Sequence, residues 1–275
     1  MSASLNLTAI HLYDGSFSAS LDLETLADYL RAIVPGTNVH AHGEFLQYYI
    51  HADEHWGQIE TLAREFAGIK VIDPRQKNRT TVPLPGEVGY EKRRLLNRAR
   101  QPAGILYDGG RLLDLFNQLL PEDGRGAHTL HLVLTNQLFG TWSFDDLRFH
   151  ARTSIYGIPS IISTAGLVEA PAKSRQYYLT RQLGVSPDVL EQQFQGQFLV
   201  YDDPRLTRVI KGYIMQALFY HLTGEPFCND PNCCLFNAHW QHELIQAQLE
   251  SPYEFCPEHQ SFLDRLRNTG SLFKY

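Results

Sequence analysis

RLTRVIKGYIMQALFYHLTGEPFCNDPNCCL, residues 205–235, holds the strongest helical pattern in the chain and leads directly into a group of cysteines. Its apolar side chains recur at the i, i+3 and i+4 spacing that places residues on one face of an α-helix. Gly224 comes next, and glycine often ends a helix in a left-handed turn because it has no Cβ. The stretch predicts an inward-facing helix over 205–223, with one face made of Leu206, Val209, Ile210, Tyr213, Ile214, Ala217, Leu218 and His221.

The cysteines are the second informative feature. All four lie in the last fifth of the chain, at Cys228, Cys233, Cys234 and Cys256. Disulfide frameworks of secreted proteins usually spread cysteines along the sequence, whereas clustered cysteines more often hold a metal. The cluster therefore predicts a metal site, and the alternative is a set of buried free thiols.

The composition limits the class of protein. The chain has 275 residues, of which 43% are hydrophobic and 20% charged, and its net charge is −6. This is the ordinary mixture of a globular protein, and the overall charge argues against nucleic-acid binding by the whole molecule. No run approaches the ~18 apolar residues of a membrane span, and the N-terminus has no secretory pattern. We expect a soluble, cytoplasmic protein.

Upstream of the helix, short β-like segments alternate with helical ones, without repeats or linker-like runs. This order favours an α/β or mixed α+β fold with a mixed sheet, in a single domain over 1–275. The expected helices are 20–34, capped by Ser20, then 55–69 and 110–121. The expected strands are 5–13, 45–51 and 128–136, with at least one more in 154–168.

Residues 75–100 depart from the acidic average, with eight basic residues against two acidic ones. The functional interpretation is a contact for phosphate or an acidic partner, to which Lys92, Arg93, Arg94 and Arg98 would contribute. The alternative is a solvated loop followed by an exposed helix start. No DNA- or RNA-binding motif accompanies the stretch.

The segment HLTGEPFCNDPNCCL (221–235) resembles the archaemetzincin family of zinc peptidases, whose signature is HExxHxxGx3Cx4CxM followed downstream by CxxC. His221, Gly224, Cys228 and Cys233 stand at the family spacing, and FCPEH (255–259) stands in the place of CxxC. LHLVLTNQLF (130–139) and YGIPSIISTAGL (156–167) resemble the strands that precede the family's active helix. The resemblance implies a three-layer metzincin-like domain, with a remnant of the active helix at 205–223 and a zinc-stapled segment at 224–262.

The catalytic residues of that signature are lost. Ala217 replaces the first histidine, Leu218 the general base, Phe227 the third histidine and Leu235 the methionine. His221 alone supplies one ligand, whereas catalytic zinc sites use three. We expect the apolar replacements to fill the former metal cavity and His221 to be a buried, hydrogen-bonded side chain.

The resemblance also implies a structural zinc. Its ligands would be Cys228, Cys233, Cys256 and His259, with histidine in place of the last cysteine, a combination found in other structural zinc sites. The spacer before Cys256 is longer than in the family, and Cys234 is a competitor for the position of Cys233.

Other histidine-rich segments carry weaker signals. His242 and Glu243 begin an HExxH pattern that Gln246 does not complete, and His239 adds only a second histidine. HAHGEF (40–45) and HADEHW (51–56), the latter with Asp53, Glu54 and His55, have no evident third segment of ligands. We interpret all of them as structural or surface residues.

The favoured hypothesis is a non-catalytic pseudoprotease with one structural zinc, acting as a protein-binding, assembly or regulatory factor. Metzincins bind extended peptides along an edge strand, so the resemblance places the contact near 154–168, with 75–100 as a second candidate. One alternative is a hydrolase of altered chemistry that uses His221 with Glu225, Asp230 or Glu243. Another is a nucleic-acid-associated protein that uses the basic stretch.

Overall fold

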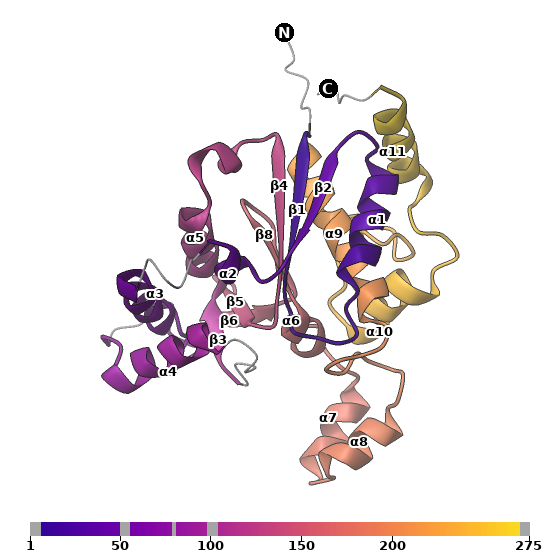
Figure 1. The fold of residues 1–275 in the computed structure, drawn as a ribbon. Helices are drawn as coiled ribbons and strands as arrows, with labels where there is room; N and C mark the ends of the chain where they lie inside the picture. Colours follow the sequence, from indigo (N-terminus) through magenta and orange to yellow (C-terminus); the bar gives the residue numbers. More distant parts are fainter. Residues whose placement is uncertain (1–6, 50–55, 79–80, 98–103, 270–275) are drawn as a thin grey trace.

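A five-stranded sheet forms the centre of the computed structural model, which describes residues 7–49, 56–78, 81–97 and 104–269 (Figure 1). The first four strands of the sheet are parallel, and the last is an antiparallel edge. The prediction of a mixed sheet is therefore confirmed. In spatial order the strands are β2 (Asn38–His42), β1 (Ala9–Gly15), β4 (Thr129–Thr135), β8 (Ser160–Ser163) and β7 (Ser154–Ile155).

Helices cover both faces of this sheet and make three layers (Figure 1). Each face has its own apolar core, because alternate residues of a strand point to opposite sides. Leu130, Leu132 and Leu134 face the core below α9, whereas Val133 faces the core below α5. On the first side lie α1 (Leu23–Ile33), α9 (Leu206–Thr223), α10 (Gln241–Ile245) and α11 (Pro257–Thr269). On the second lie α2 (Phe45–Tyr49), α3 (Trp56–Gly68), α4 (Pro85–Leu96) and α5 (Gly109–Leu119).

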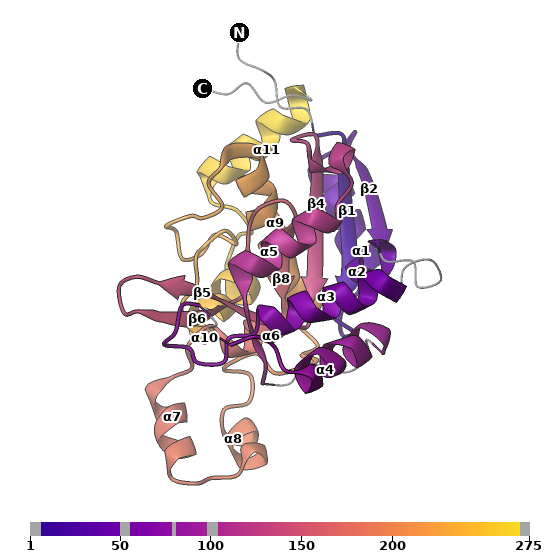
Figure 2. The same ribbon diagram turned by 90° about the vertical axis from the view of Figure 1, so that its left-hand side faces the viewer.

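A second, smaller sheet and a helical arm extend from this core. The smaller sheet contains β3 (Leu106–Asp108), β5 (Leu138–Ser143) and β6 (Arg148–Arg152), and the chain passes from β6 directly into β7. The arm carries α7 (Arg175–Gln182) and α8 (Pro187–Gln193), which project away from the sheet (Figures 1 and 2). The remaining elements are a 3₁₀ turn at Glu122–Arg125, α6 (Thr164–Glu169) and a π-helical turn at Gln246–Glu250.

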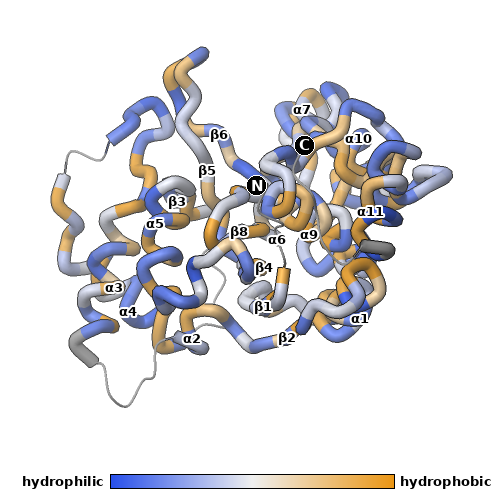
Figure 3. The backbone as a smooth tube through the Cα atoms, turned by 90° about the horizontal axis from the view of Figure 1, so that it is seen from above, coloured by the Kyte–Doolittle hydropathy of each residue, from blue (hydrophilic) through white to orange (hydrophobic). Residues whose placement is uncertain are grey.

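Helix α9 confirms the main prediction from the sequence. It ends where Gly224 adopts a left-handed conformation with φ 84°. It is buried on more than the predicted face, since Gly212, Met215, Gln216 and Phe219 are buried as well. The helix therefore lies inside the molecule, whereas the outer helices alternate between hydrophobic and hydrophilic segments, as helices with one buried face do (Figure 3).

Two local predictions are wrong. Residues 45–51 were expected to form a strand, but the described part forms α2, which buries Phe45 and Leu46. The cap of α1 is Asp22, whose carboxylate accepts a hydrogen bond from the Thr25 backbone at 3.0 Å, whereas Ser20 donates to Asp202. In the described residues no helix is both long and apolar enough to cross a membrane.

Candidate metal centre

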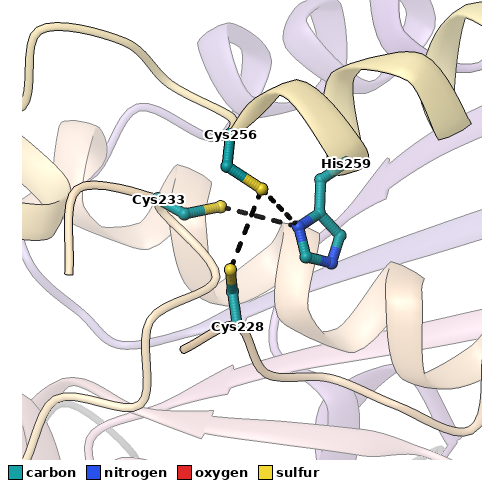
Figure 4. Close-up of side chains that lie close together, drawn as sticks. All are labelled: Cys228, Cys233, Cys256 and His259. Carbon is teal, nitrogen blue, oxygen red and sulfur yellow. Dashed lines mark hydrogen bonds between the residues drawn. The ribbon is translucent and has the colours of Figure 1, made fainter. Parts of the chain in front are cut away.

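Four side chains converge on one point beside the C-terminal end of α9. Cys228 and Cys233 come from the turns after α9, Cys256 precedes α11, and His259 lies in its first turn (Figure 4). Their ligand atoms all lie within 4.8 Å of one another. Within the described ranges this is the one group of three or more such residues close enough to share a metal ion.

The spacing of these atoms fits a tetrahedral metal. With zinc–sulfur bonds of ~2.3 Å, two sulfurs of a tetrahedral site lie about 3.8 Å apart, and a sulfur and a nitrogen about 3.5 Å apart. Cys228 Sγ and Cys256 Sγ are separated by 3.8 Å. His259 Nδ1 lies 3.0 Å from Cys256 Sγ and 3.9 Å from Cys233 Sγ. Small side-chain rotations would bring the four atoms to the spacing of a tetrahedral site.

Backbone hydrogen bonds hold the two cysteine turns in place. The amide of Cys228 donates to Leu235, and the amide of Cys233 donates to Asp230. The Asp230 amide in turn donates to Cys228 Sγ at 3.3 Å, which is the contact expected for a metal-binding thiolate. Cys256 stands directly before Pro257, so the helix that carries His259 begins at once and brings both side chains to the same place.

The structure shows which of the adjacent residues Cys233 and Cys234 is the candidate metal ligand, a choice that the sequence leaves open. A hydrogen bond from the Cys234 thiol lowers the pKa of Cys233 to about 5, and the same bond together with burial raises the pKa of Cys234. Cys234 lies outside the converging group. Burial raises the pKa of Cys228 to about 12, with the neighbouring thiols adding to the effect, and a cation beside it would favour the thiolate form.

The α9 positions that align with the archaemetzincin signature contain no pair of metal-binding side chains. Ala217 and Leu218 are fully buried, as expected. His221 is partly buried, and its Nε2 lies 2.8 Å from the carbonyl oxygen of Ala127. Burial lowers the pKa of His221, so the ring is neutral and donates to this carbonyl. Phe227 corrects the prediction of apolar filling, because 44% of its surface is exposed.

Phe227 instead lines a cavity of about 340 Å³ between α9 and the β6–β7 segment. Tyr213, Gln216 and Tyr220 of α9 face this cavity. Gln216 is 2% exposed and uses its whole amide: Oε1 accepts from Tyr156 at 2.5 Å, while Nε2 donates to the carbonyls of Cys234 and Phe236. Gln216 was not among the residues predicted from the sequence, although a polar residue within an apolar helix is a signal of such a role.

Of the three acidic residues considered as partners of His221, Glu243 and Asp230 have other side-chain contacts, and Glu225 is exposed. Glu243 accepts hydrogen bonds from the backbones of His239 and Trp240 and so caps α10. Asp230 accepts from the Tyr253 hydroxyl and the Asn232 amide.

The first histidine-rich stretch, 40–45, contributes to a row of stacked histidine rings and not to the candidate metal centre. His42 of β2 meets His11 of β1, with Nε2 and Nδ1 2.9 Å apart, and both rings pack in a row with His40 and His131. Burial lowers the pKa of His11 and of His131 to about 4. The second stretch, 51–56 with Asp53, Glu54 and His55, lies outside the described residues except for its last position.

The basic stretch is more paired than its sequence indicates. Arg94 is only 8% exposed and binds the buried Glu91, with 2.7 Å between Nε and Oε2. The prediction that Arg94 contributes to a surface contact is therefore wrong. Lys92 pairs with Glu60 at 2.8 Å. Arg93 is exposed, and Arg98 lies outside the described residues.

The predicted edge at 154–168 is narrower than expected. Within this segment, only β7 lies at a border of the sheet, since β8 pairs with both β4 and β7, and α6 follows β8.

Comparisons with known proteins identify the family of this chain. The crystal structure of archaemetzincin from Methanopyrus kandleri superposes with a TM-score of 0.41 and 12% sequence identity, covering 94% of each chain. No curated protein matches the sequence. The model of a family described as "Probable metallopeptidase family (DUF6775)" matches residues 6–266. The predicted relation to metallopeptidases is thus confirmed, and the chain belongs to this probable metallopeptidase family.

Proposed function

We propose that this protein is a non-catalytic member of its family, which holds one structural zinc ion and acts by binding another protein. The observation that carries the proposal is a contrast between two neighbouring places in the fold. The turns after α9 and the start of α11 bring together four side chains that can bind a metal, whereas α9 itself presents alanine and leucine where a zinc peptidase needs histidine and glutamate.

The chemistry of the α9 positions supports the loss of peptidase activity. Neither Ala217 nor Leu218 has an atom that binds zinc or moves a proton. The Nε2 of His221 is engaged by the Ala127 carbonyl. A zinc ion held by one imidazole has too few ligands, and nothing at position 218 polarises a water molecule.

The donor set at the second place suits zinc. Three cysteines and one histidine in tetrahedral spacing are the ligands of structural sites, which keep no open position for a substrate. Zinc there would hold thiolates whose mutual repulsion is otherwise unfavourable, and it would join the turns after α9 to α11. The same helix reaches α1, where Arg267 Nε donates to the Ile33 carbonyl. The ion would therefore stabilise the whole C-terminal layer.

The binding role rests on the edge of the sheet at β7 and the cavity beside it. An edge strand offers unpaired backbone groups to which an extended peptide can add as a further strand. Ser154 of β7 lines the cavity, so a peptide added there would place a side chain into it.

Zinc content of the purified protein, measured by elemental analysis, tests this proposal. We expect one zinc per chain, lost in Cys228→Ser. The matched control is Cys234→Ser, which changes a cysteine outside the ligand set and keeps the zinc. Two zinc ions per chain, or peptide hydrolysis that stops in His221→Ala, would mean that the catalytic site survives in another form.

A further inference from the structure

The cavity between α9 and the β6–β7 segment has a charge character opposite to that of the molecule. The chain carries a net charge of −6, yet no aspartate or glutamate is among the described residues that line this cavity. Its ionisable lining residues other than tyrosine are Arg152 and His239. A carboxylate ligand is therefore favoured here and repelled over much of the remaining surface.

Arg152 is positioned to bind such a carboxylate. Its Nε donates to the Thr141 hydroxyl at 2.7 Å, which fixes the plane of the guanidinium. Its two terminal nitrogens have no hydrogen-bond or ion-pair partner within the part of the chain that the structure describes. A guanidinium fixed at Nε presents these two nitrogens as a fork that matches both oxygens of a carboxylate.

Aromatic rings form another part of the cavity wall. The Tyr156 ring lies 6.0 Å from Tyr220 and 6.0 Å from Phe227, measured between ring centroids. Tyr220 is 37% exposed and Phe227 44%, so both offer apolar surface to a ligand. At about 340 Å³ the cavity is near the lower end of the range for ligand pockets, which suits one large side chain.

We infer that this cavity binds the free C-terminal carboxylate of a peptide whose last residue is large and apolar, with Arg152 binding the carboxylate. The inference rests on the proposed protein-binding function and names the end of the partner that enters. Ser154 at the edge strand lines the same cavity, so the residues before the C-terminus would run along β7.

Binding of two probe peptides to the zinc-loaded full chain tests the inference. The probes are acetyl-Ala-Ala-Ala-Phe as the free acid and as the C-terminal amide, titrated at pH 7 and followed by NMR chemical shifts. We expect the acid to bind at least about tenfold more tightly, the ratio typical of one charge-assisted contact. Arg152→Gln should remove this ratio.

Three further variants keep the result interpretable. Arg148→Gln is the matched control, because Arg148 lies on the same strand but already pairs with Asp146 at 3.0 Å, and it should keep the ratio. Phe227→Ala should weaken both peptides by a similar factor. If Arg152→Gln does not fold, Arg152→Lys keeps the charge without the fork and should retain only part of the ratio.

Equal binding of acid and amide overturns the inference, as does a ratio that survives in Arg152→Gln or the failure of both peptides to bind. Acetyl-phenylalanine alone binding as tightly as the peptide also overturns it, since a small acid would then be the ligand. None of these outcomes changes the zinc content or the lack of hydrolysis, so a failure here is distinguishable from a failure of the proposed function.

Discussion

Replacing Glu91 by glutamine should destabilise the protein far more than breaking a similar ion pair on its surface. Glu91 is 0% exposed and holds two cations, with Lys70 Nζ at 2.6 Å and Arg94 Nε at 2.7 Å. Tyr107 also donates to it at 3.0 Å. Both cations are at least nine-tenths buried, so the neutral amide would leave two positive charges without a counterion.

The expected loss of unfolding free energy in Glu91→Gln follows from this geometry. Removing one partner of a buried pair costs about 3–5 kcal/mol, because the remaining charge is still out of water. Two cations depend on Glu91, so we expect the upper part of that range, about 4–5 kcal/mol. Arg94 keeps its contacts with the Phe66 and Tyr107 rings, which prevents the two losses from adding in full.

A matched control is the ion pair between Glu60 of α3 and Lys92, the residue next to Glu91 on α4. Lys92 and Glu60 are 2.8 Å apart, almost the same distance, but their side chains are 37% and 45% exposed. Glu60→Gln should therefore cost much less unfolding free energy than Glu91→Gln, because solvent screens the pair. Urea unfolding at pH 7, followed by circular dichroism, measures both variants. If the two losses agreed within about 1 kcal/mol, burial would not be what distinguishes the pairs, and the reasoning would be wrong.

Three other measurements test different parts of the structure. Treatment with a chelator should lower the melting temperature of the wild type but leave that of Cys228→Ser unchanged, since the variant should have no bound zinc to lose. A similar fall in both melting temperatures would indicate that the chelator removes a metal from a different site. Gly166→Ala should lower the free energy of unfolding in urea by about 3 kcal/mol or more, because a Cβ there would lie 2.2 Å from the Arg152 carbonyl oxygen. Gly43→Ala is the control, since a Cβ at Gly43 would have nothing within 4 Å. A smaller loss of stability at Gly166 than at Gly43 would contradict the packing. Stability should fall as the pH drops from about 6.5 to about 4, because His11 and His131 have folded pKa values of about 4, below the 6.5 of the unfolded chain, so the unfolded state takes up protons first. The two histidines together account for roughly 2–4 kcal/mol of unfolding free energy after allowance for solvent screening. A His131→Asn variant whose stability has the same pH slope as that of the wild type would refute the assignment.

The predictions from the sequence were most accurate for features that depend on residues close together in the chain. The period of α9, the stop at Gly224 and the spacing of Cys228 and Cys233 all depend on neighbours in the chain, and the structure contains all three features. Residues 45–51 were predicted wrongly because aromatic residues favour strands, whereas Phe45 and Leu46 are buried together by a helix below the sheet.

The remaining differences come from contacts between distant segments. The partners of Arg94 include Glu91 on its own helix, but its burial depends on Phe66 and Tyr107, which no local pattern reveals. Gln216 likewise makes sense only once Tyr156 and the Cys234 turn are beside it. Charge and polarity can be read from a sequence, but whether solvent reaches a group depends on the whole fold.

Gln216 has a consequence for how metal and ligand act on each other. Its single amide connects Tyr156 in the cavity wall to the carbonyl of Cys234, the residue next to the proposed metal ligand Cys233. A ligand that moves Tyr156 would therefore act on the turn that contains the proposed metal ligand. Thermodynamic linkage makes such coupling reciprocal: whatever factor zinc contributes to the affinity for a peptide, the bound peptide contributes to the retention of zinc. A partner protein would then slow the loss of the ion under zinc starvation, and the complex would outlast the free chain.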